Sequence, residues 1–182
     1  FEETMSSCNV PTDLNRGAVS FLSKGEHSQC MEHLEGALVS FRNTLKQASD
    51  CGQRANTSMA CTYRLRTRSL SPDAYASSSP IDIFNQAFVF EVEEYGDDES
   101  ESMALCESYI VPVVLLYNMA LCYHDRAIRT GGSPADLKLA HKFYQHALHL
   151  ISDSNDETMG DFDELVLAAI ACNMVHICAS FY

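Results

Sequence analysis

The same spacing of small and large side chains occurs in two separate stretches of this 182-residue chain. In each stretch a small residue is followed four positions later by a large one, and three positions after that by another small one. These spacings place each set on one face of a helix, where small residues let a second helix approach closely. The chain is therefore expected to contain a repeated pair of packed helices. The two sets are Cys30, Leu34 and Ala37, and Ala140, Tyr144 and Ala147.

The stretches that precede these sets can be aligned as well. Residues 14–22, "LNRGAVSFL", match residues 116–124, "LYNMALCYH", and the alignment places Ala18 opposite Ala120. An aromatic residue follows three positions later in both. A first helix with a small residue midway is therefore expected in each pair.

A third and partial copy begins at residues 171–179, which repeat the Asn-Met pair of residues 118–119. In the second pair, Ala120 and Cys122 are small among bulky neighbours. We expect both to be small because the partner helix of the same pair crosses there, and larger side chains would hold the two backbones apart.

This pattern resembles the tetratricopeptide repeat, in which antiparallel helix hairpins stack into an α-solenoid. The resemblance covers residues 14–41, 116–151 and 171–182 and implies an all-α, tetratricopeptide-like (TPR-like) fold. Two features depart from the family pattern: Gly17 stands where a large apolar residue is common, and residues 53–105 form a large insertion. Divergent arrays with such an insertion are similar to repeat proteins of diatom-like algae.

The chain is expected to form one domain of four parts. An inserted segment, extended and acidic, separates two helix pairs, and the first helix of an incomplete third repeat ends the chain. The expected bounds are 1–182 for the domain, 14–48 for the first pair, 53–105 for the insertion, 109–151 for the second pair and 163–182 for the last helix.

The insertion has the composition of extended backbone. Residues 62–70, "TYRLRTRSL", alternate between arginine and other side chains with the period of a strand, and residues 81–92, "IDIFNQAFVFEV", are rich in β-forming residues. We expect an inserted β-ribbon of two strands that places the arginines near Glu91–Glu94. Such exposed ion pairs contribute little to stability.

Charge and cysteine usage limit the partners and the compartment. The formal net charge of −13 argues against binding to nucleic acid or anionic membranes. No apolar run approaches the roughly 20 residues that span a bilayer, so no membrane insertion is expected. Most of the eight cysteines lie in apolar or helical stretches, and none forms a CxxC pair. These features predict an intracellular reducing compartment: cytoplasm, nucleus or organelle stroma.

Several groups of polar residues have the composition of a metal site, but their spacing favours a structural role for each. His146 and His149 lie three residues apart, but no carboxylate or thiol reinforces them as metal ligands. A helix points Cys172 and Cys178 in other directions than His176. Residues 153–164 imitate the oxygen spacing of a calcium loop, but Thr158 replaces its essential glycine.

No nucleotide-binding or hydrolase motif is present in the sequence. We therefore expect no metal, no cofactor and no enzymatic activity.

The resemblance implies a non-enzymatic protein–protein interaction module whose first helices line a groove for an apolar helix or an extended peptide. One alternative is a structural subunit of a large complex that uses residues 53–105 as a strap. A second alternative is a small-ligand or metal-dependent enzyme. The groove residues that the resemblance implies are Asn15, Val19, Leu22, Tyr117, Leu121, His124, Asp125, Cys172 and His176.

The last helix carries an apolar stripe with no second helix to cover it. We expect this stripe to be covered by another protein or by further subunits of an assembly, so that the chain is not a free monomer. The stripe consists of Val166, Ile170, Met174, Ile177 and Phe181.

Overall fold

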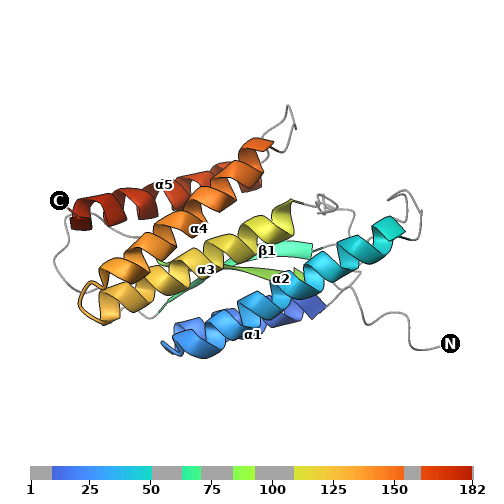
Figure 1. The fold of residues 1–182 in the computed structure, drawn as a ribbon, viewed down its shortest axis with the longest axis horizontal. Coiled ribbons are helices and arrows are strands. Elements are labelled where there is room, and N and C mark those ends of the chain that lie inside the picture. Colours follow the sequence, from blue (N-terminus) through green and yellow to red (C-terminus); the bar gives the residue numbers. More distant parts are fainter. Residues whose placement is uncertain (1–9, 51–62, 71–83, 93–108, 154–160, 182) are drawn as a thin grey trace.

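The computed structural model describes residues 10–50, 63–70, 84–92, 109–153 and 161–181. These residues are mostly helical and include one small two-stranded sheet (Figure 1). The elements are α1 (Val10–Ser23), α2 (His27–Asp50), β1 (Tyr63–Ser69), β2 (Gln86–Val92), α3 (Ile110–Arg129), α4 (Pro134–Asp153) and α5 (Asp161–Phe181).

Local sequence signals explain where several helices begin and end. Helix α1 starts one residue before Pro11, and a proline in the first turn costs no hydrogen bond. The turn that follows α1 contains Gly25 at φ 76°, a left-handed conformation that favours glycine. At the start of α4, the Asp136 amide donates to the Ser133 hydroxyl at 3.4 Å, so Ser133 caps the helix ahead of Pro134.

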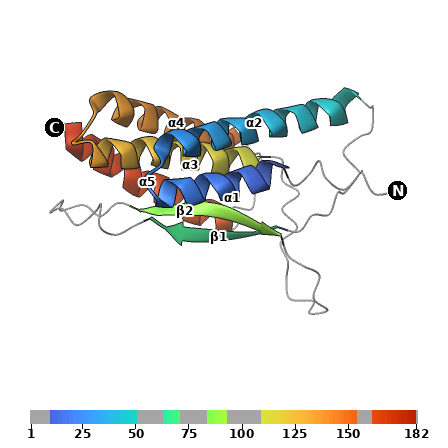
Figure 2. The same cartoon turned by 90° about the horizontal axis from the view of Figure 1, so that it is seen from below.

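The elements form three layers (Figure 2). Helices α2 and α4 form an outer layer, α1, α3 and α5 form an inner layer, and the β1–β2 hairpin lies beneath the inner helices. Strand β2 is the strand next to the helices, and it packs against α1 and α3. The hairpin therefore covers the face of the inner helices that points away from α2 and α4.

Helices α3 and α4 pack closely because a small residue separates two aromatic contacts. The Tyr117 and Tyr144 ring centroids lie 5.7 Å apart, and six residues further along α3 the Tyr123 ring stacks with the Phe143 ring at 5.7 Å. Ala120 lies between these contacts on the same face of α3 and is fully buried. Its small size has the cause that the sequence predicts, the crossing of the partner helix.

The same explanation is wrong for Cys122. Its thiol donates to the backbone carbonyl of His27 at 3.6 Å, so it packs against α2 of the first pair rather than against α4. Residues two positions apart on a helix point in nearly opposite directions, so Ala120 and Cys122 cannot face the same neighbour. Cys122 is small because the first helix pair crosses there.

The glycine at position 17 also has a packing reason. A β-carbon placed at Gly17 would lie 3.0 Å from the His33 ring of α2. The adjacent Phe21 ring packs against the same His33 ring at 4.8 Å. The departure from the family pattern at this position therefore brings α1 and α2 together.

The two strands expected in the insertion are present and antiparallel. In their register Arg64 is opposite Glu91 and Ser69 is opposite Gln86, which places the arginine-bearing strand beside the first residue of Glu91–Glu94. The rest of that acidic stretch lies outside the described residues, as do residues 154–160 of the calcium-like spacing at 153–164.

The expectation of an uncovered stripe on α5 is wrong for most of its residues. Val166, Ile170 and Ile177 are buried, and Met174 is partly buried against the core. The side chain of Phe181 lies outside the described part of the chain. The stripe is buried because α5 packs against α4 and because Asn173, at its centre, bonds to the segment that leads into β2.

Helix α5 is also the most apolar of the helices. Its stretch Phe162–Ala179 has a mean hydropathy of 1.6, so by length and composition alone it could cross a membrane. However, 44% of this stretch is buried inside the protein, and a single helix of this kind is weak evidence of a membrane span.

Candidate functional site

The backbone of β2 has two hydrogen-bonding edges, and only one of them faces β1. In an antiparallel pair, alternate residues direct their N–H and C=O groups toward the partner strand, and the residues between them direct these groups away. Asn85 accepts a bond from Leu70, the residue after β1, so the odd-numbered residues bond toward β1. The groups of Phe84, Gln86 and Phe88 therefore point toward the inner helices.

Two asparagines from different helices hold the backbone at Phe88. The Phe88 amide donates to Oδ1 of Asn118 at 3.0 Å, and Nδ2 of Asn118 donates to the Phe88 carbonyl at 2.7 Å. The same carbonyl accepts a bond from Nδ2 of Asn15 at 3.1 Å. Nδ2 of Asn118 also donates to Oδ1 of Asn15 at 2.8 Å, which joins α1 to α3. The two side chains thus act on Phe88 as a neighbouring strand would.

A second grip holds the backbone four residues earlier. The Phe84 amide donates to Oδ1 of Asn173 on α5 at 2.9 Å, and Nδ2 of Asn173 donates to the Phe84 carbonyl at 3.2 Å. Between the two grips, the Tyr117 hydroxyl donates to the Gln86 carbonyl at 3.1 Å. Side chains of α1, α3 and α5 therefore follow the outer edge of this segment from Phe84 to Phe88.

The second grip is itself held in place by the helices. Nδ2 of Asn173 donates to the Tyr144 hydroxyl of α4 at 2.9 Å. Burial raises the pKa of Tyr144 well above its ordinary value, so this hydroxyl stays neutral. Tyr144 therefore helps to orient the amide of Asn173, in addition to the contacts of this amide with Phe84.

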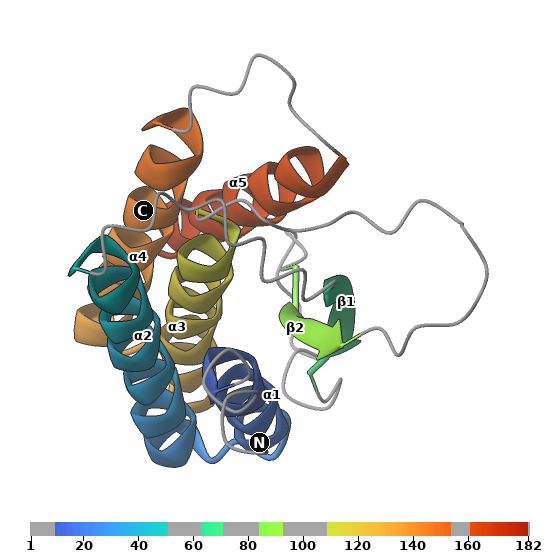
Figure 3. The ribbon, with the colours of Figure 1, turned by 90° about the vertical axis from the view of Figure 1, so that its right-hand side faces the viewer.

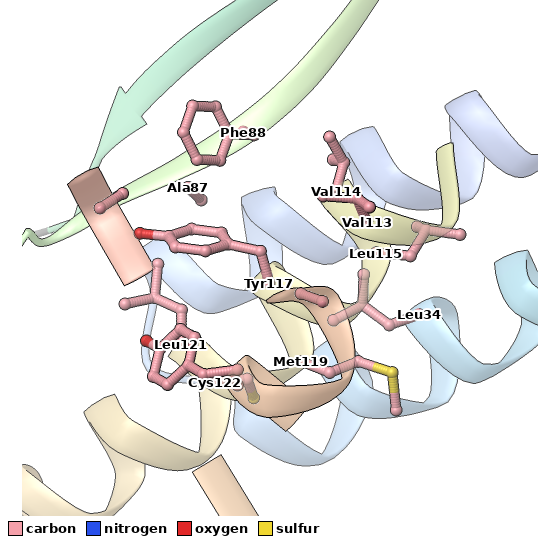
Figure 4. Close-up of a cluster of buried hydrophobic side chains, with 14 of the residues drawn as sticks. Leu34, Ala87, Phe88, Val113, Val114, Leu115, Tyr117, Met119, Leu121 and Cys122 are labelled. Carbon is pink, nitrogen blue, oxygen red and sulfur yellow. The ribbon is translucent and has the colours of Figure 1, made fainter. Parts of the chain in front are cut away.

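Aromatic packing accompanies these bonds. The Phe88 ring meets the Tyr117 ring edge to face at 4.8 Å, as Figure 4 shows, and stacks with Phe84 at 6.2 Å. Ala87 and Val89, which point to the other face of β2, are buried as well. Both side-chain faces of β2 are thus covered, its free edge faces the inner helices, and β1 lies on the far side of β2 (Figure 3). We call the surface that holds this edge, formed by Asn15, Asn118, Asn173 and Tyr117, the inner groove.

The groove residues expected from the sequence fall into three groups. Asn15 and Tyr117 bond to β2 or the residues leading into it. Val19, Leu22 and Leu121 are buried in the core, and Cys172 is exposed on α5. The other three belong to buried polar contacts between helices; they are His124, Asp125 and His176.

His124 and His176 connect α3 to α5. Nε2 of His124 and Nδ1 of His176 lie 2.9 Å apart, while Nδ1 of His124 is buried without a hydrogen-bond partner. A bare acceptor costs less there than an unpaired N–H, so we assign His124 as the donor to His176. Burial, with a smaller effect from His176, lowers the pKa of His124 to about 3, and burial also lowers the pKa of His176. The pair is neutral and links the helices.

Asp125 joins the two helix pairs. Its carboxylate lies 2.6 Å from Nε2 of His27, the first residue of α2, and 2.8 Å from Nε of Arg129, one turn further along α3. Asp125 is fully buried, so these partners supply the hydrogen bonds that burial requires. Asp125 therefore links α3 to the start of α2.

The sequence analysis did not identify the two residues that hold the strand most directly, Asn118 and Asn173. It also did not identify Phe84 and Phe88, whose backbone groups they bind. One signal was available, because the Asn-Met pair repeats at 118–119 and 173–174. Asn15 was harder to relate to them. The alignment that places Ala18 opposite Ala120 puts Asn15 opposite Tyr117, and in the structure both of these bond to the same segment.

Metal ligands do not gather in the described parts of the chain. No three His, Cys, Asp or Glu side chains there lie close enough to hold a metal ion. Among the histidines that the sequence offered as a metal pair, His146 is exposed and His149 bonds to the carbonyl of Gln145.

Comparison with protein-family models, curated proteins and solved structures gives no match to this chain.

Proposed function

We propose that this protein is a non-enzymatic interaction module whose inner groove binds an extended segment of another protein. The observation that carries this proposal is the grip of Asn118 on Phe88, which uses the amide oxygen for the backbone N–H and the amide nitrogen for the backbone C=O. Asn173 repeats this pairing at Phe84.

Contacts of this kind favour an extended peptide over a helix as the ligand. The N–H and C=O groups of a helix are bonded within the helix, except at its ends, and cannot reach Asn118 or Asn173. An extended segment offers both groups at every second residue along one edge. Because the bonds reach only the backbone, they do not depend on the side chains of the ligand.

We further propose that the helices are a divergent tetratricopeptide-like array. Support comes from the fully buried small residues Ala18 and Ala120 in the first helices of the two pairs, and from the matching roles of Asn118 on α3 and Asn173 on α5. A reducing compartment remains part of the proposal, since the four cysteines in the described ranges are free thiols.

The test is a binding measurement on a chain whose own strand has been loosened. The variant Phe84→Ser/Phe88→Ser keeps all the groove residues but removes the two rings that anchor the segment. A labelled peptide with the sequence of residues 82–92 should bind this variant, followed by fluorescence anisotropy. The same peptide with N-methyl groups at the positions of Phe84 and Phe88 should not bind, because it lacks the two N–H donors. Equal binding of both peptides, or binding of neither, would overturn the proposal.

The exposed face of α5 favours a second candidate function, a structural subunit of an assembly. Leu165 and Val175 are 42% and 54% exposed on that face, and Cys172 and Cys178 are exposed beside them. Within the described parts of 53–105, β2 packs on α1 and α3 of the same chain, so we propose that this assembly role uses α5 rather than a strap. Its test is the mass in solution: an oligomer that Val175→Glu converts to a monomer supports it, and a monomeric unaltered chain contradicts it.

A further inference from the structure

We infer that β2 and the residues leading into it are a displaceable internal ligand, and that the inner groove selects extended segments with aromatic residues four positions apart. This inference rests on the proposed function and adds to it the class of ligand and the form of its regulation. It is carried by the spacing of the two backbone grips, by the rings at those positions and by the way the hairpin is attached.

The two grips define the register of a ligand. Asn173 holds the backbone at Phe84 and Asn118 holds it at Phe88, and four residues of extended chain span about 13 Å. The Tyr117 hydroxyl fills the interval by donating to Gln86. A strand shifted by one residue would turn these N–H and C=O groups toward β1 and lose all three contacts, so the groove accepts only alternate registers.

Side chains four apart in a strand project from the same face, and here both are phenylalanine. The Phe88 ring is fully buried, meets the Tyr117 ring at 4.8 Å and stacks with Phe84 at 6.2 Å. Tyr117 in turn packs on Tyr144 at 5.7 Å, so the ring that receives Phe88 is fixed by α4. The groove therefore offers the Tyr117 ring at the position of Phe88, and a second ring four positions earlier in the ligand stacks on the Phe88 ring itself.

The occupant can be exchanged because its polar contacts are those of any extended chain. Each bond to Phe84, Gln86 and Phe88 reaches a backbone group, so an incoming strand can reproduce all of them. The contact of the hairpin with the helices is made chiefly by β2, while β1 lies outside the groove. Release of β2 would free the hairpin from the helices, while the contacts of α1 with α2, of α2 with α3 and of α3 with α4 do not involve the hairpin.

A tethered occupant acts as a competitor at an effective concentration of roughly millimolar. Only molecules whose groove is empty can bind an external segment, so the apparent affinity falls in proportion to the empty fraction. Weakening β2 should strengthen the binding of an outside peptide.

The experiment titrates the labelled peptide of residues 82–92 into three full-length chains: the unaltered protein, Phe88→Leu and Phe84→Ser/Phe88→Ser. The peptide should bind the double variant at least tenfold more tightly than the unaltered protein, with Phe88→Leu between them. A second peptide, with alanine in place of both phenylalanines, should bind the double variant at least tenfold more weakly than the first. Phe88→Leu keeps an apolar side chain and serves if the double variant does not fold.

The outcomes separate this inference from the function on which it rests. Equal affinity for all three chains would overturn the internal ligand, and equal affinity for the two peptides would overturn the aromatic selection. In either case a continued loss of binding on N-methylation would leave the peptide-binding function standing. If no peptide binds any folded chain, both proposals fall.

Discussion

At the scale of single residues, the groove depends on amide side chains that are fully buried yet nearly saturated with hydrogen bonds. Asn118 accepts one bond and donates two, and its partners belong to α1 and to β2. Buried polar groups cost stability unless they are paired, so each asparagine favours the one arrangement of strand and helices that pairs it. These residues specify where the strand lies more than they add to the total stability.

Replacing Asn118 should therefore be costly. Asn118→Leu leaves the Phe88 amide and Oδ1 of Asn15 without the partners they have now, at about 1–3 kcal/mol for each buried group. We expect a loss of about 3 kcal/mol in the free energy of unfolding, measured with urea. Asn43→Leu, at an exposed position of α2, is the control and should change it by less than about 0.5 kcal/mol. Similar losses in both variants would contradict the role of Asn118.

The buried histidine pair predicts a pH dependence of stability. Burial lowers the pKa of His124 from 6.5 to about 3, with a smaller contribution from His176, while Asp125 acts weakly in the opposite direction. The unfolded chain then binds a proton that the folded chain refuses. Stability is complete above pH 6.5 and falls as the pH drops toward 3, by at most about 1.4 kcal/mol per pH unit.

The measurement is urea unfolding at pH 7.5, 6 and 5. His124→Phe should reduce the slope of stability against pH, whereas His146→Phe, at an exposed position, should leave it unchanged. An unaltered slope in His124→Phe would show that this pair does not control the acid response.

At the scale of elements, helix periodicity was readable because each helix buries one face against its partner. The spacing of Cys30, Leu34 and Ala37 predicted α2, and that of Ala140, Tyr144 and Ala147 predicted α4. The alternation in 62–70 predicted β1. The position of the hairpin was not readable, because bonds such as that from Asn15 to Phe88 join residues 73 positions apart. No local spacing records a pairing of that kind.

The packing of α3 on α4 should tolerate no extra bulk at Ala120. Ala120→Leu should overpack the site between the Tyr117–Tyr144 and Tyr123–Phe143 contacts and cost about 1–3 kcal/mol. The control is Ala171→Leu, at an exposed position of α5, which should cost less than about 0.5 kcal/mol. Thermal unfolding of the two variants provides the measurement. Ala127 would be a poor control, since it is as fully buried as Ala120.

At the scale of the whole molecule, two helix pairs, a fifth helix and a hairpin share one core. The insertion supplies part of that core, because Phe88, Phe90 and Leu70 are buried with the helices. The helices are stabilised in this way by a segment that the sequence alone assigned to a separate role. The apolar face of α5 that remains exposed is a different face from the expected stripe.

The cysteines give a prediction for the folded chain as a whole. A hydrogen bond with the Cys30 thiol, together with burial, raises the pKa of the Cys122 thiol well above its ordinary value. The Cys122 thiol therefore stays protonated, which makes it a poor nucleophile. Alkylation of the native protein, mapped by mass spectrometry, should modify Cys172 and Cys178 and leave Cys30 and Cys122 intact. An excess of reductant should not change the melting temperature. Rapid modification of Cys122, or a drop of several degrees with reductant, would contradict the assignment of buried free thiols.

Amide hydrogen exchange of the Phe88 N–H reports whether helix side chains hold the backbone of β2. This N–H points away from β1, and its acceptor is Oδ1 of Asn118. In the unaltered chain it should be strongly protected from exchange. Asn118→Leu should remove that protection and leave the Phe84 N–H, held by Asn173, protected. If the Phe88 N–H of the unaltered chain exchanged at the rate of an unfolded peptide, Asn118 would not hold the backbone of β2.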